Sequence, residues 1–203
     1  MPENVSQSAP ALLAPWEQEQ MTPRQRKMFA TCAANMEAET GRTLAQWVEI
    51  AQTCPDTTVR GRMDWLDQRH GVRAMRAHIL MAAAFGDAAP TPDALADALW
   101  KDPALRRFAD QIIARARALP DVIVGQRKGY TAFSRTVQFA AIRPVKGRIR
   151  LGLALAPDAS PLLTLRGRSE SLQDRLISVI DIPTDAALEP RIGDLLRQAW
   201  DGA

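Results

Sequence analysis

The sequence predicts an α+β protein, in which an N-terminal all-α bundle of about four helices precedes a helix–antiparallel sheet–helix sandwich with about five or six strands. Apolar residues recur at helical spacing as far as about residue 119. After Pro120 the apolar and polar residues alternate instead, which is typical of strands. The stretch 86–92 holds one glycine and two prolines and interrupts the first pattern, which marks a domain boundary.

Helix caps delimit the elements of the bundle. Thr22 and Pro23 have the residue types of an N-cap and a first helical residue. Thr43 is followed three residues later by Gln46, the spacing of a capping box. Gly41 and Gly71 supply helix ends. The expected helices cover residues 22–40, 43–54, 58–70 and 72–85, with Leu44, Trp47, Val59, Met63 and Leu66 facing inward.

The second module begins with a helix after Asp102 and ends with a helix whose first turn contains Pro190. The expected strands are 122–125, 130–134, 137–142, 148–155, 162–166 and 176–182. The chain therefore divides into a flexible leader over residues 1–20, the helical bundle over 21–86, a linker with a short helix over 87–101, and the α+β sandwich over 102–203.

Composition excludes several classes of protein. No apolar run has the length of about 20 residues that a membrane-spanning helix needs, and the first residues lack the pattern of a signal peptide. Two cysteines, Cys32 and Cys54, are too few for a secreted disulfide scaffold. We therefore expect free thiols, a cytoplasmic location and no contact with a membrane.

Charge is distributed unevenly along the chain. Residues 101–168 carry fourteen Lys and Arg against four Asp and Glu, whereas residues 169–203 carry three against seven. A basic segment of this kind attracts phosphate-rich partners. It is also what a solvated face would carry, neutralised in part if the acidic C-terminal helix packs nearby.

Two sets of residues resemble known families. The segment 35–44, with Trp47, Trp65-Leu66 and His70-Gly71, resembles a small helical bacterial family of unknown function, numbered 4287. The segments 130–133, 138–140 and 151–153, with Arg175 and the terminal helix, resemble a second such family, numbered 5655. The two commonly occur in tandem, and the resemblance covers about residues 25–203. It implies no activity. The order of elements in the second module is similar to that of frataxin-like sandwiches, an analogy of topology alone.

Motifs of catalysis, cofactor binding and metal binding are missing from the sequence. There is no nucleophile elbow and no phosphate-binding loop. The two histidines, His70 and His78, are not paired with cysteines at metal-binding spacing, and His70 precedes a helix-ending glycine as a capping or surface residue would. We expect no enzyme, no cofactor and no metal.

The late strands suggest an anion site. Alternation places Ile149, Leu151 and Leu153 on one face of a strand, opposite Arg148 and Arg150, and it places Leu163 and Leu165 opposite Arg166 and Arg168. If the helices cover the apolar face, the four arginines share the other face of neighbouring strands, and Arg143 and Lys146 extend the cluster. The planar fork of arginine suits phosphates and carboxylates, although an antiparallel sheet with one wet face carries charges in any case.

The bundle offers a second possibility. Its third and fourth helices are joined tightly at His70-Gly71, and Arg73 and Arg76 lie near the start of the fourth, as in a helix-turn-helix. The bundle as a whole is close to neutral, which weighs against DNA binding. We therefore expect a non-catalytic binding or regulatory protein whose second module recognises an anionic partner such as nucleic acid. The alternatives are a protein–protein adaptor that uses the bundle, and a small-molecule-binding module.

Overall fold

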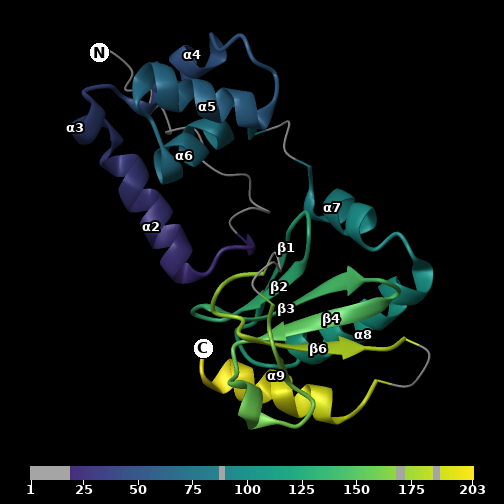
Figure 1. Cartoon of the computed structure of the whole chain (residues 1–203). Coiled ribbons are helices and arrows are strands. Elements are labelled where there is room, and N and C mark those ends of the chain that lie inside the picture. The colour runs from purple at the N-terminus through teal and green to yellow at the C-terminus, as the bar shows by residue number, and fades with distance from the viewer. Residues whose placement is uncertain (1–18, 87–89, 168–171, 185–187) are drawn as a thin grey trace, which may run out of the picture. The chain divides into compact units, whose positions relative to one another are not determined.

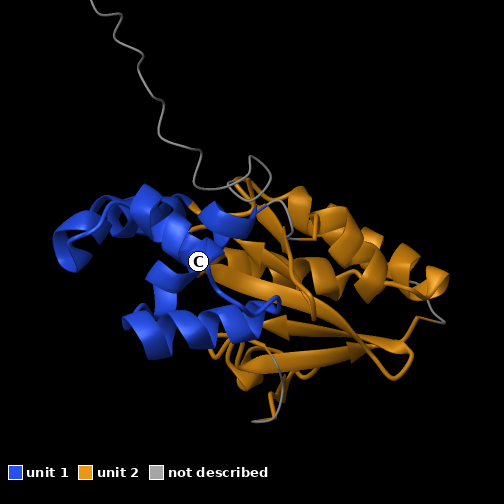
Figure 2. Cartoon of the chain, turned by 90° about the horizontal axis from the view of Figure 1, so that it is seen from above, with its two compact units in different colours: residues 1–18, 23–89 blue, residues 19–22, 90–203 orange. Residues whose placement is uncertain are grey.

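A computed structural model describes residues 19–86, 90–167, 172–184 and 188–203 (Figure 1). The fold is α+β, with helices first and a mixed region of helices and antiparallel strands after them. The described residues form two compact units, residues 23–86 in one, and Glu19–Thr22 together with the residues from Pro90 onward in the other (Figure 2). The division between the two units falls between residue 86 and Pro90. Residues 1–18 of the expected leader lie outside the described residues.

In the described part of the first unit, all regular secondary structure is helical. Their bounds are α2 Pro23–Ala34, α3 Met36–Thr40, α4 Leu44–Gln52, α5 Val59–His70 and α6 Ala74–Phe85. The first expected helix is therefore divided at Asn35. Two hydrogen bonds of helical spacing still bridge the division, from the Asn35 amide to the Thr31 carbonyl and from the Glu39 amide to the Asn35 carbonyl.

Local capping chemistry explains where these helices begin and end. The Thr43 hydroxyl accepts from the Gln46 amide, and the Gln46 side chain accepts from the Thr43 amide, so the capping box is complete. The Thr58 hydroxyl caps α5 in the same way, through the Gly61 amide. Gly71 ends α5 at a φ of 66°, in the left-handed region that a side chain would strain.

A core of large side chains holds the first unit together. Trp47 and Leu66 are buried, as expected from their apolar stripes, and the Trp47 indole nitrogen donates to the Thr40 hydroxyl at 2.7 Å. Val59 was expected to face inward and is 69% exposed. It is the first residue of α5, and it follows an exposed stretch, residues 55–58, so the helix starts in solvent before its later turns reach the core.

The second unit contains a six-stranded antiparallel sheet with the strand order β1-β2-β3-β4-β6-β5. The strands are β1 Ile123–Gln126, β2 Thr131–Ser134, β3 Gln138–Val145, β4 Arg148–Leu153, β5 Thr164–Leu165 and β6 Ser178–Ile182. The helices are α7 Pro92–Leu99, α8 Pro103–Arg117 and α9 Arg191–Asp201, with a short 3-10 turn η2 at Pro157–Ala159. Six strands match the expected number.

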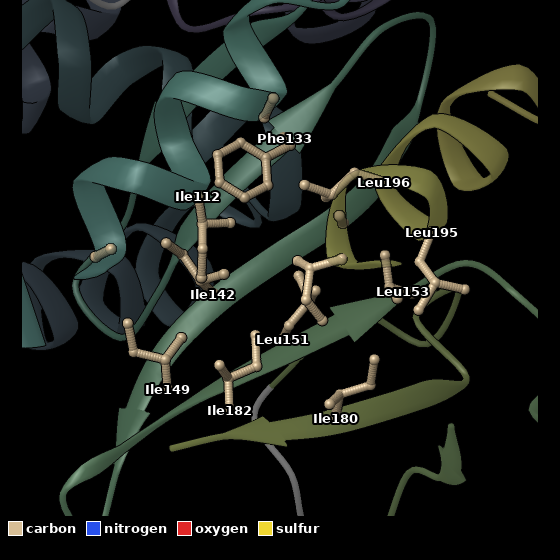
Figure 3. Packing of buried hydrophobic residues seen from close by; sticks show 14 of the residues in the cluster. Ile112, Phe133, Ile142, Ile149, Leu151, Leu153, Ile180, Ile182, Leu195 and Leu196 are labelled. Atoms are coloured by element: carbon tan, nitrogen blue, oxygen red, sulfur yellow. The ribbon is translucent and has the colours of Figure 1, made fainter. Parts of the chain in front are cut away.

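One face of the sheet is covered by α8 and α9. Ile112 of α8 and Leu196 of α9 pack with Phe133, Ile142 and Leu151 from three adjacent strands (Figure 3). All five side chains are at most 1% exposed. Burying side chains of this size stabilises the fold by roughly 1.5–3 kcal/mol each, and it leaves the opposite face of the sheet to the residues that alternate with them.

The segment Glu19–Thr22 belongs to the second unit rather than to the leader and the bundle. The Gln20 side-chain oxygen accepts from the Gln126 amide at 2.8 Å and from the Arg127 guanidinium at 3.3 Å. It thereby satisfies a backbone donor at the outer edge of β1, the first strand of the sheet. Sequence periodicity carries no information about such a contact, because 106 residues separate the two partners.

Candidate functional site

Three of the predicted arginines gather at one end of the sheet, on the face that the helices leave uncovered. Arg148 and Arg150 alternate along β4 with the buried Ile149 and Leu151, as the sequence predicted. Arg143 of β3 is the register partner of Arg150 across the ladder, so both side chains lie on the same face. We call Arg143, Lys146, Arg148 and Arg150 the hairpin cluster, because all four belong to the β3–β4 hairpin.

The turn of this hairpin sets the position of Lys146. Val145 pairs with Arg148, so the loop consists of Lys146 and Gly147 alone. Their φ angles are 48° and 74°, the sign that a type I′ turn requires at both central residues. Lys146 accepts a conformation that asparagine or glycine adopts more readily, and it is exposed at the tip of the hairpin.

One carboxylate, from β6, lies within the cluster. Asp181 is the register partner of Arg150, and the two form a bidentate ion pair in which Nε and Nη2 of Arg150 each donate to one carboxylate oxygen at 2.6 Å. These hydrogen bonds lower the pKa of Asp181 below its usual 3.8, while burial acts in the opposite direction and the charge of Arg148 lowers the pKa further. Asp181 therefore compensates Arg150 first, and Arg148 at longer range.

Arg143 has no such compensation. Its Nε is buried without a hydrogen-bond partner, and no carboxylate among the described residues pairs with its guanidinium. Like charges directly opposite one another in a ladder destabilise a sheet, and Arg143 faces Arg150 in this way. The hairpin cluster sets four cations against one carboxylate, and its least compensated member is half-buried.

Arg166 does not join the cluster. We predicted neighbouring strands, but β6 lies between β4 and β5. Arg150 pairs with Asp181 of β6, whereas Arg166 lies beside Ile177, so the two arginines are also offset by four residues, about 13 Å along the strand. The guanidinium of Arg166 donates to the Leu172 carbonyl at 2.7 Å and to Asp174 at 3.2 Å. Arg166 therefore links the end of β5 to Leu172 and Asp174, and Arg168 lies outside the described residues.

Leu165 lies on the face where alternation placed it, but it is not buried there. It pairs with Ser178, which pairs in turn with Leu153 of the helix-covered core, yet Leu165 is 72% exposed whereas Leu163 is 6% exposed. The strand β5 has only two residues and forms the edge of the sheet, so its second residue lies beyond the cover of the helices.

On the face of the sheet opposite α8 and α9, a small apolar cluster packs next to the charged residues. Leu172 and Leu176 pack there on Ala141 and Val179. This packing depends on Gly152 of β4, because a Cβ at that position would lie 2.7 Å from Leu172 Cδ1. This apolar cluster lies beside the hairpin end of the face, where Lys146 and Arg148 are exposed.

Two protein-family models match the sequence of this chain. The family model described as "Domain of unknown function (DUF5655)" matches residues 96–203, which is more than half of the chain. The chain belongs to the DUF5655 family. A second model, "Domain of unknown function (DUF4287)", matches residues 28–82, so the two domains stand in tandem in the order that the resemblance indicated. No curated protein and no solved structure matches the chain.

Within the DUF4287 match, sequence reasoning missed the surroundings of His70. We expected a capping or surface histidine, but its ring lies edge-on to two tryptophans, with centroids 5.8 Å from Trp47 and 4.6 Å from Trp65, and its Nε2 is buried without a partner. No local pattern in the sequence indicates that Trp47 and His70 are in contact, because they belong to different helices, α4 and α5. Among the described residues, no three His, Cys, Asp or Glu side chains gather as a metal site would require.

Membrane insertion was not expected from the sequence. None of the helices in the described parts of this DUF5655 protein combines the length and the apolar character needed to cross a bilayer.

Proposed function

We propose that this protein acts by binding rather than by catalysis, and that its DUF5655 module recognises a polyanionic partner through the hairpin cluster. The observation that carries the proposal is Arg143, a half-buried arginine whose Nε has no partner and which faces a second arginine across the ladder. A fold that retains such an arrangement forgoes stability. A phosphate bound over the face of these two strands would compensate the charge.

Nucleic acid is the class of partner that we favour. Arginine forks bind phosphate oxygens in a bidentate manner, and Lys146 and Arg148 are exposed at the hairpin tip, where an extended backbone has access to them. Binding of this kind rests on phosphate neutralisation and is independent of base sequence. We also propose a cytoplasmic location, which the two free thiols support, because disulfides persist in oxidising compartments.

The test removes exposed charges and leaves the Arg150–Asp181 pair intact. Lys146→Asn suits the type I′ turn, and Arg148 is exposed, so the double variant Lys146→Asn/Arg148→Ala should unfold within about ±0.5 kcal/mol of the parent. Fluorescence anisotropy with labelled single-stranded and duplex oligonucleotides should show weaker binding for the double variant. The slope of log K against log salt should fall by about one unit for each lost phosphate contact.

The matched control is Arg107→Ala/Arg117→Ala. Both arginines are exposed on α8, the helix that covers the opposite face of the same sheet, and their loss changes the net charge by the same amount. The control should retain nearly all affinity. An equal loss of affinity in the two double variants would mean that binding depends on net charge alone. Unchanged affinity and salt slope in Lys146→Asn/Arg148→Ala would mean that the hairpin cluster is a solvated face.

A further inference from the structure

A groove crosses the surface of the first unit between α2 and the start of α6. It is open to solvent and has a volume of about 630 Å³, within the range of roughly 300–1,000 Å³ that small-molecule sites occupy. The groove lies wholly within the helical unit, separate from the sheet that carries the hairpin cluster. The residues that matter for its chemistry are Arg24, Lys27, Met28 and Cys32 of α2, and Met75 and Arg76 of α6.

Three of the residues that line the groove, Met28, Cys32 and Met75, have apolar side chains. Residues 24, 27, 28 and 31 of α2 recur every three or four positions, so one face of the helix lines the groove. Of the residues of α2, Phe29 is the buried one, and Met28 is 51% exposed. Met28, Cys32 and Met75 are therefore the apolar strip of the groove, in which Met28 is exposed and Cys32 and Met75 are half-buried. Methionine adapts readily to ligands of irregular shape.

The charged residues that line the groove are four cations, Arg24, Lys27, Arg73 and Arg76, and one carboxylate, Glu39, and Asp67 outside the lining pairs with Arg73. Arg73 pairs with Asp67 at 2.5 Å and Arg76 pairs with Glu39, whereas Arg24 and Lys27 are exposed and form no ion pair with a described residue. Four cations thus stand against two carboxylates, which leaves a net charge of +2. The Nε of Arg76 is also buried without a partner.

We infer that this groove binds a small organic anion with an apolar body. A carboxylate or phosphate head would be held by Arg24, Lys27 and Arg76, and the body would lie along Met28 and Met75. The volume, the apolar strip and the excess of positive charge select such an amphiphile over a neutral ligand, which would leave the cations unused, and over a bare anion, which would leave the strip in water.

Calorimetric titration of the full chain with four probes separates these ligand types. The probes are decanoate, decyl phosphate, decanol and inorganic phosphate, each below the concentration at which it self-associates. Binding of decanoate or decyl phosphate, with much weaker binding of decanol and inorganic phosphate, supports the proposal, and the better of the two anions identifies the head group. Equal binding of decanol and decanoate would overturn it, because the cations would then contribute nothing.

The two cysteines report where the probe binds. Cys32 lines the groove and Cys54 does not, and both are half-buried thiols of the same unit. A bound amphiphile should slow alkylation of Cys32 and leave the rate at Cys54 unchanged, as measured by mass spectrometry of the labelled peptides. Protection of both thiols or of neither would place any binding elsewhere and contradict the inference.

Matched variants test the role of the charges. Arg24→Ala/Lys27→Ala removes two exposed cations that line the groove and should weaken decanoate binding about tenfold or more, the loss expected for a charge-assisted hydrogen bond. Arg60→Ala/Arg69→Ala removes two exposed cations of α5 away from the groove and should leave the affinity unchanged. Equal effects of the two double variants would overturn the assignment. Neither double variant touches the hairpin cluster, so the two proposals can fail independently.

Discussion

Replacing Asp181 by asparagine removes the one carboxylate that β6 contributes to the hairpin cluster. The side chains of Arg150 and Asp181 are 22% and 36% exposed, so solvent screens their interaction in part. Exposed pairs contribute up to about 1 kcal/mol, and breaking a fully buried pair costs about 3–5 kcal/mol. We expect Asp181→Asn to lower the free energy of unfolding by about 2 kcal/mol, or roughly 10 °C in the Tm of a domain of this size.

Removing the partner arginine should cost less. After Arg150→Met, Asp181 retains the charge of Arg148 nearby, and the opposition of two like charges between Arg143 and Arg150 disappears. The unbranched methionine also retains much of the packing of the arginine stem. We expect a loss of about 1 kcal/mol, toward the value for exposed pairs. We therefore expect Asp181→Asn to lower the free energy of unfolding more than Arg150→Met does, because the cluster contains more cations than carboxylates.

The effect of Asp181→Asn should depend on pH. Hydrogen bonds from Arg150 lower the pKa of Asp181 below 3.8 in the folded protein, so the ionised carboxylate stabilises the fold at all pH values above 3.8. That stability is lost as the pH falls through the lowered pKa, because the carboxyl then becomes protonated. The gap between parent and variant should be full at pH 7 and should close well below pH 3.8.

Hydrogen exchange of the β4 and β6 amides measures the stability of the second unit alone. Anisotropy titrations with the same proteins should show Asp181→Asn binding oligonucleotides more tightly, because the competing carboxylate is gone. The reasoning fails if Asp181→Asn costs less stability than Arg150→Met, or if the gap persists undiminished at low pH. Weaker binding by Asp181→Asn would count against the hairpin cluster as an anion site.

Further substitutions test the remaining parts of the fold. Trp47→Ala should cost about 3–5 kcal/mol, because Trp47 is 2% exposed, and a melting curve within a degree or two of the parent would contradict its place in the core. Gly152→Val should displace the Leu172 side chain and cost about 1–3 kcal/mol by overpacking, whereas unchanged exchange at the Leu172 amide would show that the segment yields freely. Mass spectrometry of the unreduced protein should find both Cys32 and Cys54 as free thiols, and a mass lower by two hydrogens would mean a disulfide.

Local chemistry made much of the fold predictable from the sequence. The capping box of Thr43 and Gln46 and the terminating Gly71 act within a few residues, and both occur as expected. Alternation along β4 also gave the right faces to Ile149 and Arg150, because the period of two is fixed by the strand itself. These features depend on residues that are close together in the sequence, so they can be predicted from the sequence alone.

The order of strands could not be obtained in the same way. Alternation assigns Arg166 to a face but does not say which strand lies beside it, and β6 pairs with both β4 and β5 although it follows them in the chain. The contact between Gln20 and Gln126 is of the same kind. Each depends on pairings between distant segments, which no short pattern in one strand specifies.

The pairings between distant segments also decide which of the basic residues counted in the sequence are neutralised in the fold. The basic segment 101–168 and the acidic segment 169–203 meet through ion pairs of residues that precede the C-terminal helix. Asp181 of β6 pairs with Arg150, and Asp174 pairs with Arg166. The acidic segment thus neutralises two of the predicted arginines and leaves Arg143, Lys146 and Arg148 without a carboxylate in direct contact among the described residues. An anionic partner of the sheet should therefore bind at the β3–β4 turn, where the excess of positive charge persists, and not along the whole face.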